Sequence, residues 1–225
     1  MASEPCPSCV IVLFPTYSGP DGAMSASRYA YMGGFDGTSN VLAGLVNNIP
    51  VKGTHAHSFV MSFTQLSELG STTVRHAVTG EQVEFLTLVL EKKELLPCCT
   101  ESNEGELAAF VSYAQAFPSG FLALVDTYDS LLSGTPNYLA VGWALHELGY
   151  EPRGIRLDSG DLAYLSTKVR IMFKEADELI GKEIFHSGKI IVSNDINEDV
   201  LHSLRSSENS IDVFGKCHNM LLLIV

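Results

Sequence analysis

The chain has 225 residues, of which 14 are Lys or Arg and 26 are Asp or Glu, so its net charge is −12; hydrophobic residues make up 46% and charged residues 18%. This composition is too apolar and too weakly charged for an intrinsically disordered protein. The acidic balance excludes a generic nucleic-acid binder and disfavours binding to anionic membranes. The length suits one large domain or two small ones.

No stretch of the sequence predicts a membrane-spanning helix or a signal peptide. The longest apolar runs, 9–14 and 221–225, fall far short of the roughly 20 residues that cross a bilayer. The amino terminus has no basic segment of the kind that opens a signal peptide. Five cysteines without regular spacing are typical of a reducing compartment, so we expect a cytoplasmic protein. Cys6 and Cys9 form a lone CxxC, and incidental cysteines are favoured over a zinc site there because structural zinc takes four ligands.

Along the chain, short runs of Val, Ile and Leu alternate with segments of helical periodicity. This alternation predicts an α/β protein with parallel strands, either a barrel or an open doubly wound sheet. Residues 1–18 form no recognisable unit, and residues 70–104 are interpreted as an insertion or lid. In chain order, the predicted segments are helix Asp36–Val46, strand Ile49–Lys52, helix His57–Leu69, helix Glu104–Phe117, strand Phe121–Val125, helix Thr135–Leu148, strand Gly154–Leu157, helix Asp161–Ile180, strand Lys189–Val192, helix Ile196–Leu204 and strand Ile211–Phe214.

Three of these helices carry signals at their ends. Thr135 is predicted as an N-cap with Pro136 at the first helical position, and Gly149 would follow the last turn of the same helix. Asp161 is predicted to cap the next helix, and Asp195 opens the one after it with a spacing like that of a capping box.

In a parallel βα architecture the ligand lies beyond the carboxyl ends of the strands. Asp158 and Asp126 each follow a strand and are therefore functional candidates; Asp126 could orient a histidine or bind a ligand hydroxyl. Ser193 could donate to a phosphate, although a role as helix cap explains the same residue. The segments directly after the predicted strands are Gly53–Ser58, Asp126–Asp129, Asp158–Asp161, Ser193–Asp195 and Gly215.

The turn after the first strand carries two histidines. Backbone N–H groups at Gly53 and Thr54 could hold a phosphate or a carboxylate. His57 lies in the first turn of the predicted helix, where the helix dipole disfavours its protonation, and a neutral imidazole could attack a phosphoryl group or act as a general base. Spacing alone favours the alternative that His55 and His57 are polar capping residues. A zinc site is a weaker alternative, because no carboxylate or thiolate partner is placed by the sequence.

Arg156 stands in an otherwise apolar strand and must be paired or face a cavity. Its guanidinium fork suits bidentate capture of a carboxylate or a phosphate. A structural ion pair with Asp158 or Asp126 is an equal alternative. Strand alternation directs Arg156 and Asp158 to the same side, which is compatible with either interpretation.

Four blocks, in this order along the chain, resemble the nicotinate phosphoribosyltransferase family. They are GFDGTSNVLAG at 34–44, IPVKGTHAHS at 49–58, LVDTY at 124–128 and GIRLDSGDL at 154–162. The resemblance runs from Gly19 to Gly215. It implies the type II phosphoribosyltransferase fold, an irregular α/β barrel with a separate α/β domain, of which this chain would hold an incomplete part.

The resemblance also implies an activity, the ATP-assisted condensation of nicotinate with phosphoribosyl pyrophosphate to nicotinate mononucleotide, on the salvage route to NAD. It implies that ATP phosphorylates His57 and that Thr54 and Arg156 contact nicotinate. Asp126, Asp158 and Ser193 complete the predicted substrate site. Mg²⁺ is expected with the pyrophosphate substrate, although the sequence displays no protein-only magnesium cage. A homodimer with active sites built across the interface is expected by the same resemblance.

Both ends of the chain depart from the family. Residues 1–18 lack the basic residues that relatives carry ahead of Gly19, and residues 216–225 stand where relatives continue into a Gly-Thr phosphate-binding turn and further strands. We therefore expect an atypical segment 1–18, a core 19–215 and an atypical tail 216–225. An alternative hypothesis is a truncated, inactive protein that at most binds nicotinate or pairs with a full-length subunit. A third is an unrelated βα-barrel enzyme that binds phosphate.

Overall fold

The structure is a computed structural model that describes residues 8–11, 19–193 and 196–216. It divides into two compact units, one formed by Met1–Gly53 with Ile191–Val225 and the other by Thr54–Ile190. The predictions made for Cys6, Asp195 and residues 217–225 lie outside the described residues. Within the described ranges, no helix combines the length and the apolar character needed to cross a membrane.

The first unit contains a parallel set of strands. β7 (Val213–Lys216) pairs with β1 (Ser8–Ile11) on one side and with residues 191–193 of β6 (Lys189–Ser193) on the other, parallel to both. The α/β class with parallel strands is therefore confirmed. β1 was not predicted from the sequence.

Three helices accompany these strands in the first unit. α1 (Gly19–Met32) packs against α2 (Val41–Asn47), and α8 (Glu198–Ser206) follows β6 in the chain. α2 begins later than predicted because the side chain of Asn40 caps it, accepting the Ala43 N–H at 3.0 Å.

Two predictions for this unit are wrong. The predicted strand Ile49–Lys52 is reduced to an isolated bridge between Thr38 and Val51. Ser193 does not cap α8, because it is the last residue of β6 and the side chain of Asn197 accepts the Val200 N–H at 2.9 Å instead.

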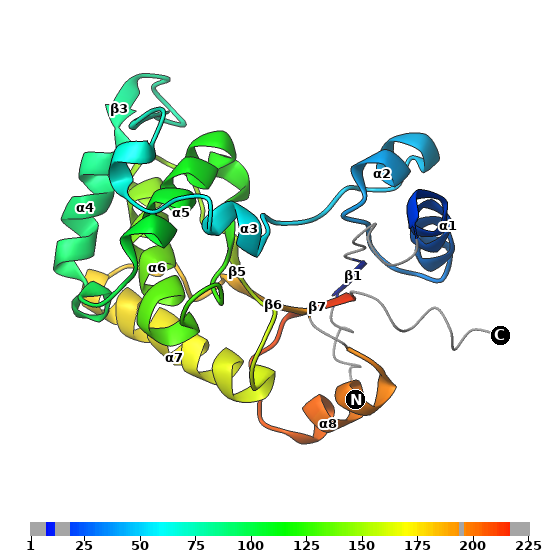
Figure 1. The fold of residues 1–225 in the computed structure, drawn as a ribbon. Coiled ribbons are helices and arrows are strands. Elements are labelled where there is room, and N and C mark those ends of the chain that lie inside the picture. Colours follow the sequence, from blue (N-terminus) through cyan, green and yellow to red (C-terminus); the bar gives the residue numbers. More distant parts are fainter. Residues whose placement is uncertain (1–7, 12–18, 194–195, 217–225) are drawn as a thin grey trace. The chain divides into compact units, whose positions relative to one another are not determined.

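The second unit is built around one central helix. α6 (Thr135–Glu147) packs against α4 (Phe85–Leu95), α5 (Glu104–Ala116) and α7 (Leu162–Ile180), as Figure 1 shows. The predicted limits of α5, α6 and α7 are confirmed to within one residue. Asp161 caps α7 as predicted, accepting the Tyr164 N–H at 3.0 Å.

Aromatic rings fill the core of the second unit. Tyr138 of α6 is fully buried, and its ring stacks on Phe121 with centroids 5.5 Å apart. The rings of Phe173 and Phe185 pack against other sides of Tyr138, at 5.6 and 5.8 Å. Burial of such rings supplies a large share of the hydrophobic stabilisation of a domain. This unit therefore has a core of its own that can hold a site rigidly.

The strands of the second unit position its loops. β4 (Leu122–Leu124) and β5 (Gly154–Leu157) run parallel, with Leu124 opposite Arg156. β6 starts beside β5, since the Lys189 N–H donates to the Arg153 carbonyl at 2.9 Å. β5 begins at a glycine with φ +138°, where any side chain would overlap the Lys189 backbone. β2 (Thr73–Arg75) and β3 (Gln82–Glu84) form a separate antiparallel pair.

Three further expectations for this unit are corrected. The helix predicted over His57–Leu69 is wrong, because α3 (His57–Val60) has four residues and only a short 3-10 turn, Leu66–Glu68, follows. Residues 70–104 contain β2, β3 and α4 packed on α6, which does not fit a lid. Thr135 is not an N-cap, because a π-helical turn, Ser130–Gly134, leads directly into α6.

Candidate functional site

The site lies at the carboxyl ends of β4 and β5, within the unit Thr54–Ile190. Asp126 stands two residues after Leu124 and Asp158 two residues after Arg156, and these two strand residues are paired in register. The Asp158 N–H and the Ser159 hydroxyl both donate to Asp126 Oδ2, at 2.8 and 2.6 Å. The two aspartates, each predicted as a functional candidate, therefore lie at one edge.

His57 reaches this edge from a segment far away in sequence. Its Nδ1 lies 3.0 Å from Thr127 Oγ1, and its Nε2 lies 3.9 Å from Asp126 Oδ1 and 3.7 Å from Asp158 Oδ2. The side chain is 38% exposed, whereas that of Asp126 is 2% exposed. The imidazole is thus fixed on one side by a hydroxyl, faces two carboxyl groups on the other, and remains accessible to a ligand.

Asp126 Oδ1 is buried and has no hydrogen-bond partner among the described residues. The His57 ring lies 3.9 Å from this oxygen. Because an unsatisfied buried oxygen costs free energy, such a group is typical of a position kept for chemistry.

Arg156 is buried in β5, with a side chain 5% exposed. Its Nη2 lies 3.0 Å from Asp158 Oδ1 and its Nη1 donates to Thr54 Oγ1 at 3.2 Å. The ion pair with Asp158, one of the two alternatives, is therefore present. This ion pair does not exclude the capture of a ligand carboxylate or phosphate, because a guanidinium has five N–H donors and can bind more than one acceptor.

His55 has a different role from the capping role considered above. Its Nε2 accepts the Leu124 N–H of β4 at 3.1 Å, and its ring packs against Phe59, Phe110 and Tyr113. Burial lowers the pKa of this imidazole to about 4, so the ring is neutral at pH 7. His55 therefore anchors the turn that carries Thr54 and His57 to β4. The two-residue spacing gave no signal for this division, because residues two apart in an extended segment face the same side.

The short length of α3 changes the argument for His57. A helix of four residues carries little macrodipole, so the predicted effect of a helix start on its protonation does not apply. The Ala56 N-cap also has no side-chain hydrogen bond. What holds the ring is the set of side chains after β4 and β5.

The structure brings five of the six predicted site residues into one unit: Thr54, His57, Asp126, Arg156 and Asp158. Ser193 belongs to the other unit, where it is buried opposite Gly215 of β7. Thr127, which the sequence analysis did not single out, is a functional candidate through its contact with His57. Among the described residues no group of three His, Cys, Asp or Glu side chains is placed to hold a metal ion.

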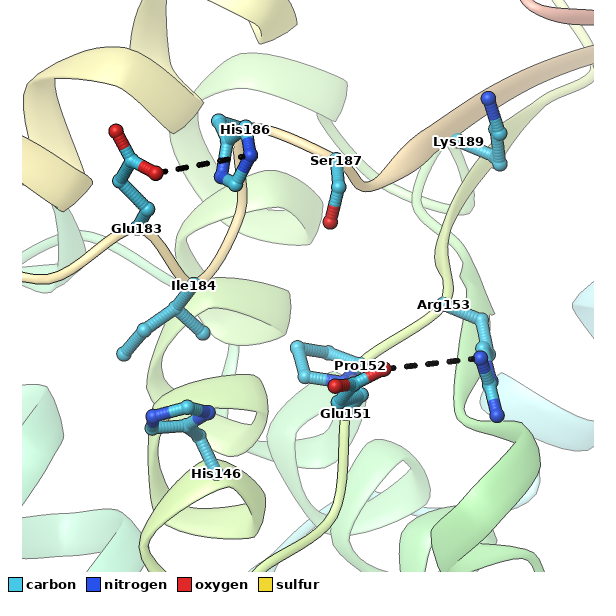
Figure 2. Close-up of a pocket in the computed structure, with 9 residues that line it drawn as sticks. All are labelled: His146, Glu151, Pro152, Arg153, Glu183, Ile184, His186, Ser187 and Lys189. Atoms are coloured by element: carbon cyan, nitrogen blue, oxygen red, sulfur yellow. Dashed lines mark ion pairs between the residues drawn. The ribbon is translucent and has the colours of Figure 1, made fainter.

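A cavity of about 310 Å³ lies at the opposite end of β5, next to its amino terminus and the start of β6. Figure 2 shows His146, Glu183 and His186 on one wall and Arg153 and Lys189 on the other. Arg153 pairs with Glu151 at 4.0 Å, and His186 lies 4.0 Å from Glu183 and 3.9 Å from Asp177. These pairs are long, and the side chains of Arg153 and His186 are more than half exposed, so we do not assign the site to this cavity.

Comparison with known proteins confirms the resemblance. The chain is 47% identical over 205 residues to nicotinate phosphoribosyltransferase of Caenorhabditis elegans, which covers 88% of this chain and 36% of that protein. It is 49% identical over 214 residues to nicotinate phosphoribosyltransferase 1 of Arabidopsis thaliana, with 90% and 38% covered, and 43% identical over 204 residues to the human enzyme, with 88% and 38% covered. No family model matches the chain.

The solved structures give the same result. The crystal structure of human nicotinic acid phosphoribosyltransferase matches with a TM-score of 0.83 and 40% identity over 92% of this chain and 43% of that one. Nicotinate phosphoribosyltransferase from Vibrio cholerae matches with a TM-score of 0.57 at 14% identity, which indicates the fold alone. The chain thus spans between a third and a half of the length of the proteins it matches.

Proposed function

We propose that this chain carries the nicotinate-binding and phosphorylation centre of a nicotinate phosphoribosyltransferase. Such an enzyme condenses nicotinate with phosphoribosyl pyrophosphate, with the help of ATP, to nicotinate mononucleotide in NAD biosynthesis. The observation that carries the proposal is the position of the His57 imidazole, between the Thr127 hydroxyl and the carboxyl groups of Asp126 and Asp158. The similarity along the chain supports it.

In this proposal His57 is the nucleophile toward ATP. A bond forms between an imidazole nitrogen and the γ-phosphorus as the phosphorus–oxygen bond to ADP breaks. The ring gains positive charge in that step, and the carboxyl groups of Asp126 and Asp158 are placed to stabilise it. Thr127 fixes the ring orientation, so that little reorganisation is required.

Arg156 and Thr54 are proposed to bind the carboxylate of nicotinate. The guanidinium is nearly free of water, which strengthens its attraction for a second anion. Asp158 and Thr54 hold the planar guanidinium in one orientation before the ligand arrives, and a planar fork held in this way suits the two oxygens of a carboxylate.

The remaining substrates and partners are proposed by similarity. Mg²⁺ would accompany phosphoribosyl pyrophosphate, and we assign it no protein ligand. Ser193 is proposed as a phosphate contact. We further propose a homodimer, a cytosolic location and an irregular βα barrel of which the strands of this chain form an incomplete part.

The test is turnover by the purified chain. Nicotinate, ATP and phosphoribosyl pyrophosphate are supplied with Mg²⁺, and both mononucleotide and phosphorylated protein are measured. We expect both signals in the wild type and neither in His57→Ala, while His202→Ala, which removes an exposed histidine of α8, retains them.

Absence of both signals in the wild type would refute the proposed activity. In that event titration calorimetry with nicotinate distinguishes two outcomes. Binding that is lost in Arg156→Lys supports the alternative of a nicotinate-binding protein without turnover, and absence of binding refutes the assignment of Arg156 and Thr54.

A further inference from the structure

A second buried polar cluster lies beside the His57 site and has no role in the steps above. Its centre is Glu106, a fully buried carboxyl group in the first turn of α5. Glu106 Oε2 accepts two hydrogen bonds, from the Ser133 hydroxyl and, at 3.2 Å, from Asn137 Nδ2. Its other oxygen, Oε1, is buried without a partner among the described residues.

The hydrogen bonds around Glu106 join the start of α5 to the turn Ser130–Gly134. Ser133 Oγ donates to Glu106 and also accepts the Asn103 N–H at 2.8 Å. Asn137 Nδ2 donates to the Asn103 carbonyl at 3.0 Å. Because the hydroxyl of Ser133 has one proton, its donation to Glu106 fixes Oε2 as an acceptor.

The same turn is pressed against the end of β4. Any β-carbon on Gly134 would overlap the carbonyl group of Val125, the residue directly before Asp126. The turn is closed at its start by Asp129, whose Oδ1 accepts the N–H groups of Leu131 and Leu132 at 2.9 and 2.7 Å. Contacts therefore run from Glu106 through Ser133 and Gly134 to the strand end that carries Asp126 and Thr127.

The surroundings of Glu106 disfavour a charge. The groups that contact its carboxyl are a hydroxyl and an amide, and no cation faces it among the described residues, whereas Asp126 and Asp129 are its charged neighbours. Burial, with a smaller contribution from those two aspartates, raises the pKa of Glu106 to about 7, against the lowering effect of the Ser133 and Asn137 hydrogen bonds. Asn137 Oδ1 is another buried acceptor without a partner there. A proton on Glu106 would therefore remove one charge and add a hydrogen-bond donor to a cluster in which Glu106 Oε1 and Asn137 Oδ1 have no partner among the described residues.

We propose that Glu106 is a positioning residue for His57: as a neutral carboxylic acid it anchors the turn Ser130–Gly134, and through that turn it holds Asp126 and Thr127 against the imidazole. The inference rests on the proposed function for its significance. Its geometry and its test do not require turnover.

The first measurement is the infrared absorption of protonated carboxyl groups at pH 6. We expect a band from a buried carboxylic acid that weakens as the pH rises through about 7. The band should be lost in Glu106→Gln and kept in Glu94→Gln, a matched change at an exposed position of α4. A band that persists in Glu106→Gln, or no band in the wild type, overturns the neutral form.

The second measurement is the nitrogen spectrum of the His57 ring without substrates, with the signals identified by their loss in His57→Asn. Ser133→Ala and Glu106→Ala should shift the signals of both ring nitrogens, since Thr127 and Asp126 are then free to move. Glu106→Gln retains an acceptor oxygen for Ser133 and Asn137 and should restore the wild-type signals.

The outcomes separate this inference from the proposed function. Wild-type His57 signals in Ser133→Ala would overturn the positioning role, and this variant carries the test if Glu106→Ala does not fold. Shifted signals in a chain that shows no turnover would leave the positioning role intact and refute only the activity.

Discussion

The arginines at the two ends of β5 differ in their burial and in their contacts. At the carboxyl end, Arg156 is 5% exposed and contacts Asp158 and the distant Thr54. At the amino end, Arg153 is 57% exposed, its ion pair is with Glu151 at 4.0 Å, and its Nε donates to the Ser119 carbonyl at 3.0 Å. Burying a charge is expensive, and apolar side chains in place of both members of a buried ion pair would often be at least as stable. The difference supports the proposal that the carboxyl end holds the site, whereas Arg153 at the amino end is largely solvated.

The largest effect should come from removing the buried arginine. Arg156→Met leaves Asp158 beside the buried strand without its cation, and we expect a loss of about 3–5 kcal/mol in the free energy of unfolding. The matched change Arg153→Met should cost less than ~1 kcal/mol, because water already solvates that pair. Urea unfolding of both variants measures the difference. Equal losses would contradict the contrast between the two ends.

A smaller, pH-dependent effect is expected at His55. Because burial lowers its pKa from 6.5 to about 4, the unfolded chain binds a proton between these values and the folded chain does not. Its contribution to stability is therefore fully present above pH 6.5 and is lost as the pH falls toward 4, by about 3 kcal/mol in total.

Two substitutions separate this titration from the hydrogen bond that His55 accepts. His55→Gln and His55→Leu should both remove the pH-dependent loss, measured by unfolding at pH 7 and pH 4.5. Only the leucine leaves the Leu124 N–H without an acceptor, at a cost of about 1–3 kcal/mol at every pH. An unchanged pH dependence in both variants would mean that His55 is solvated.

The smallest effect concerns Thr127. Thr127→Val keeps the shape of the side chain and removes one hydrogen bond to His57, so we expect a loss of about 1 kcal/mol in stability and a shift of the His57 Nδ1 signal. Ser187→Ala, at an exposed position of the cavity near the amino end, should change stability by no more than ~0.5 kcal/mol. If Thr127→Val changes neither the stability nor the His57 Nδ1 signal, Thr127 has no role in the proposed mechanism.

Elements with strong local signals were predictable. β5, α5, α6 and α7 follow the predicted limits closely because periodicity, Asp161 and Gly149 act within a few residues of the elements they bound. α1, β1 and α4 were missed. The buried side of α1 carries only the small residues Ala23, Ser27 and Ala30, and α4 follows a short hairpin within a polar segment.

The sequence named most of the residues that the structure brings together in the candidate site, but it did not predict the contacts between them. Alternation predicted that Arg156 and Asp158 face the same side, and they form an ion pair. The pairing of β4 with β5, which brings Asp126 to them, was not predicted. The attachment of His57 to Thr127, and of His55 to the Leu124 backbone, joins residues about seventy positions apart. Nothing local to either partner encodes such a contact.

Short-range periodicity and contiguous motifs were sufficient to predict the class of fold and the family that the chain resembles, and to propose the strand ends as the place of the site. Only the tertiary structure decided that α3 is too short for a dipole to act on His57, that Asp158 engages Arg156, and that Glu106 lies beneath the site. The physical reason is that burial and charge pairing depend on which distant segments exclude water from a side chain, and that exclusion exists only once the chain has folded.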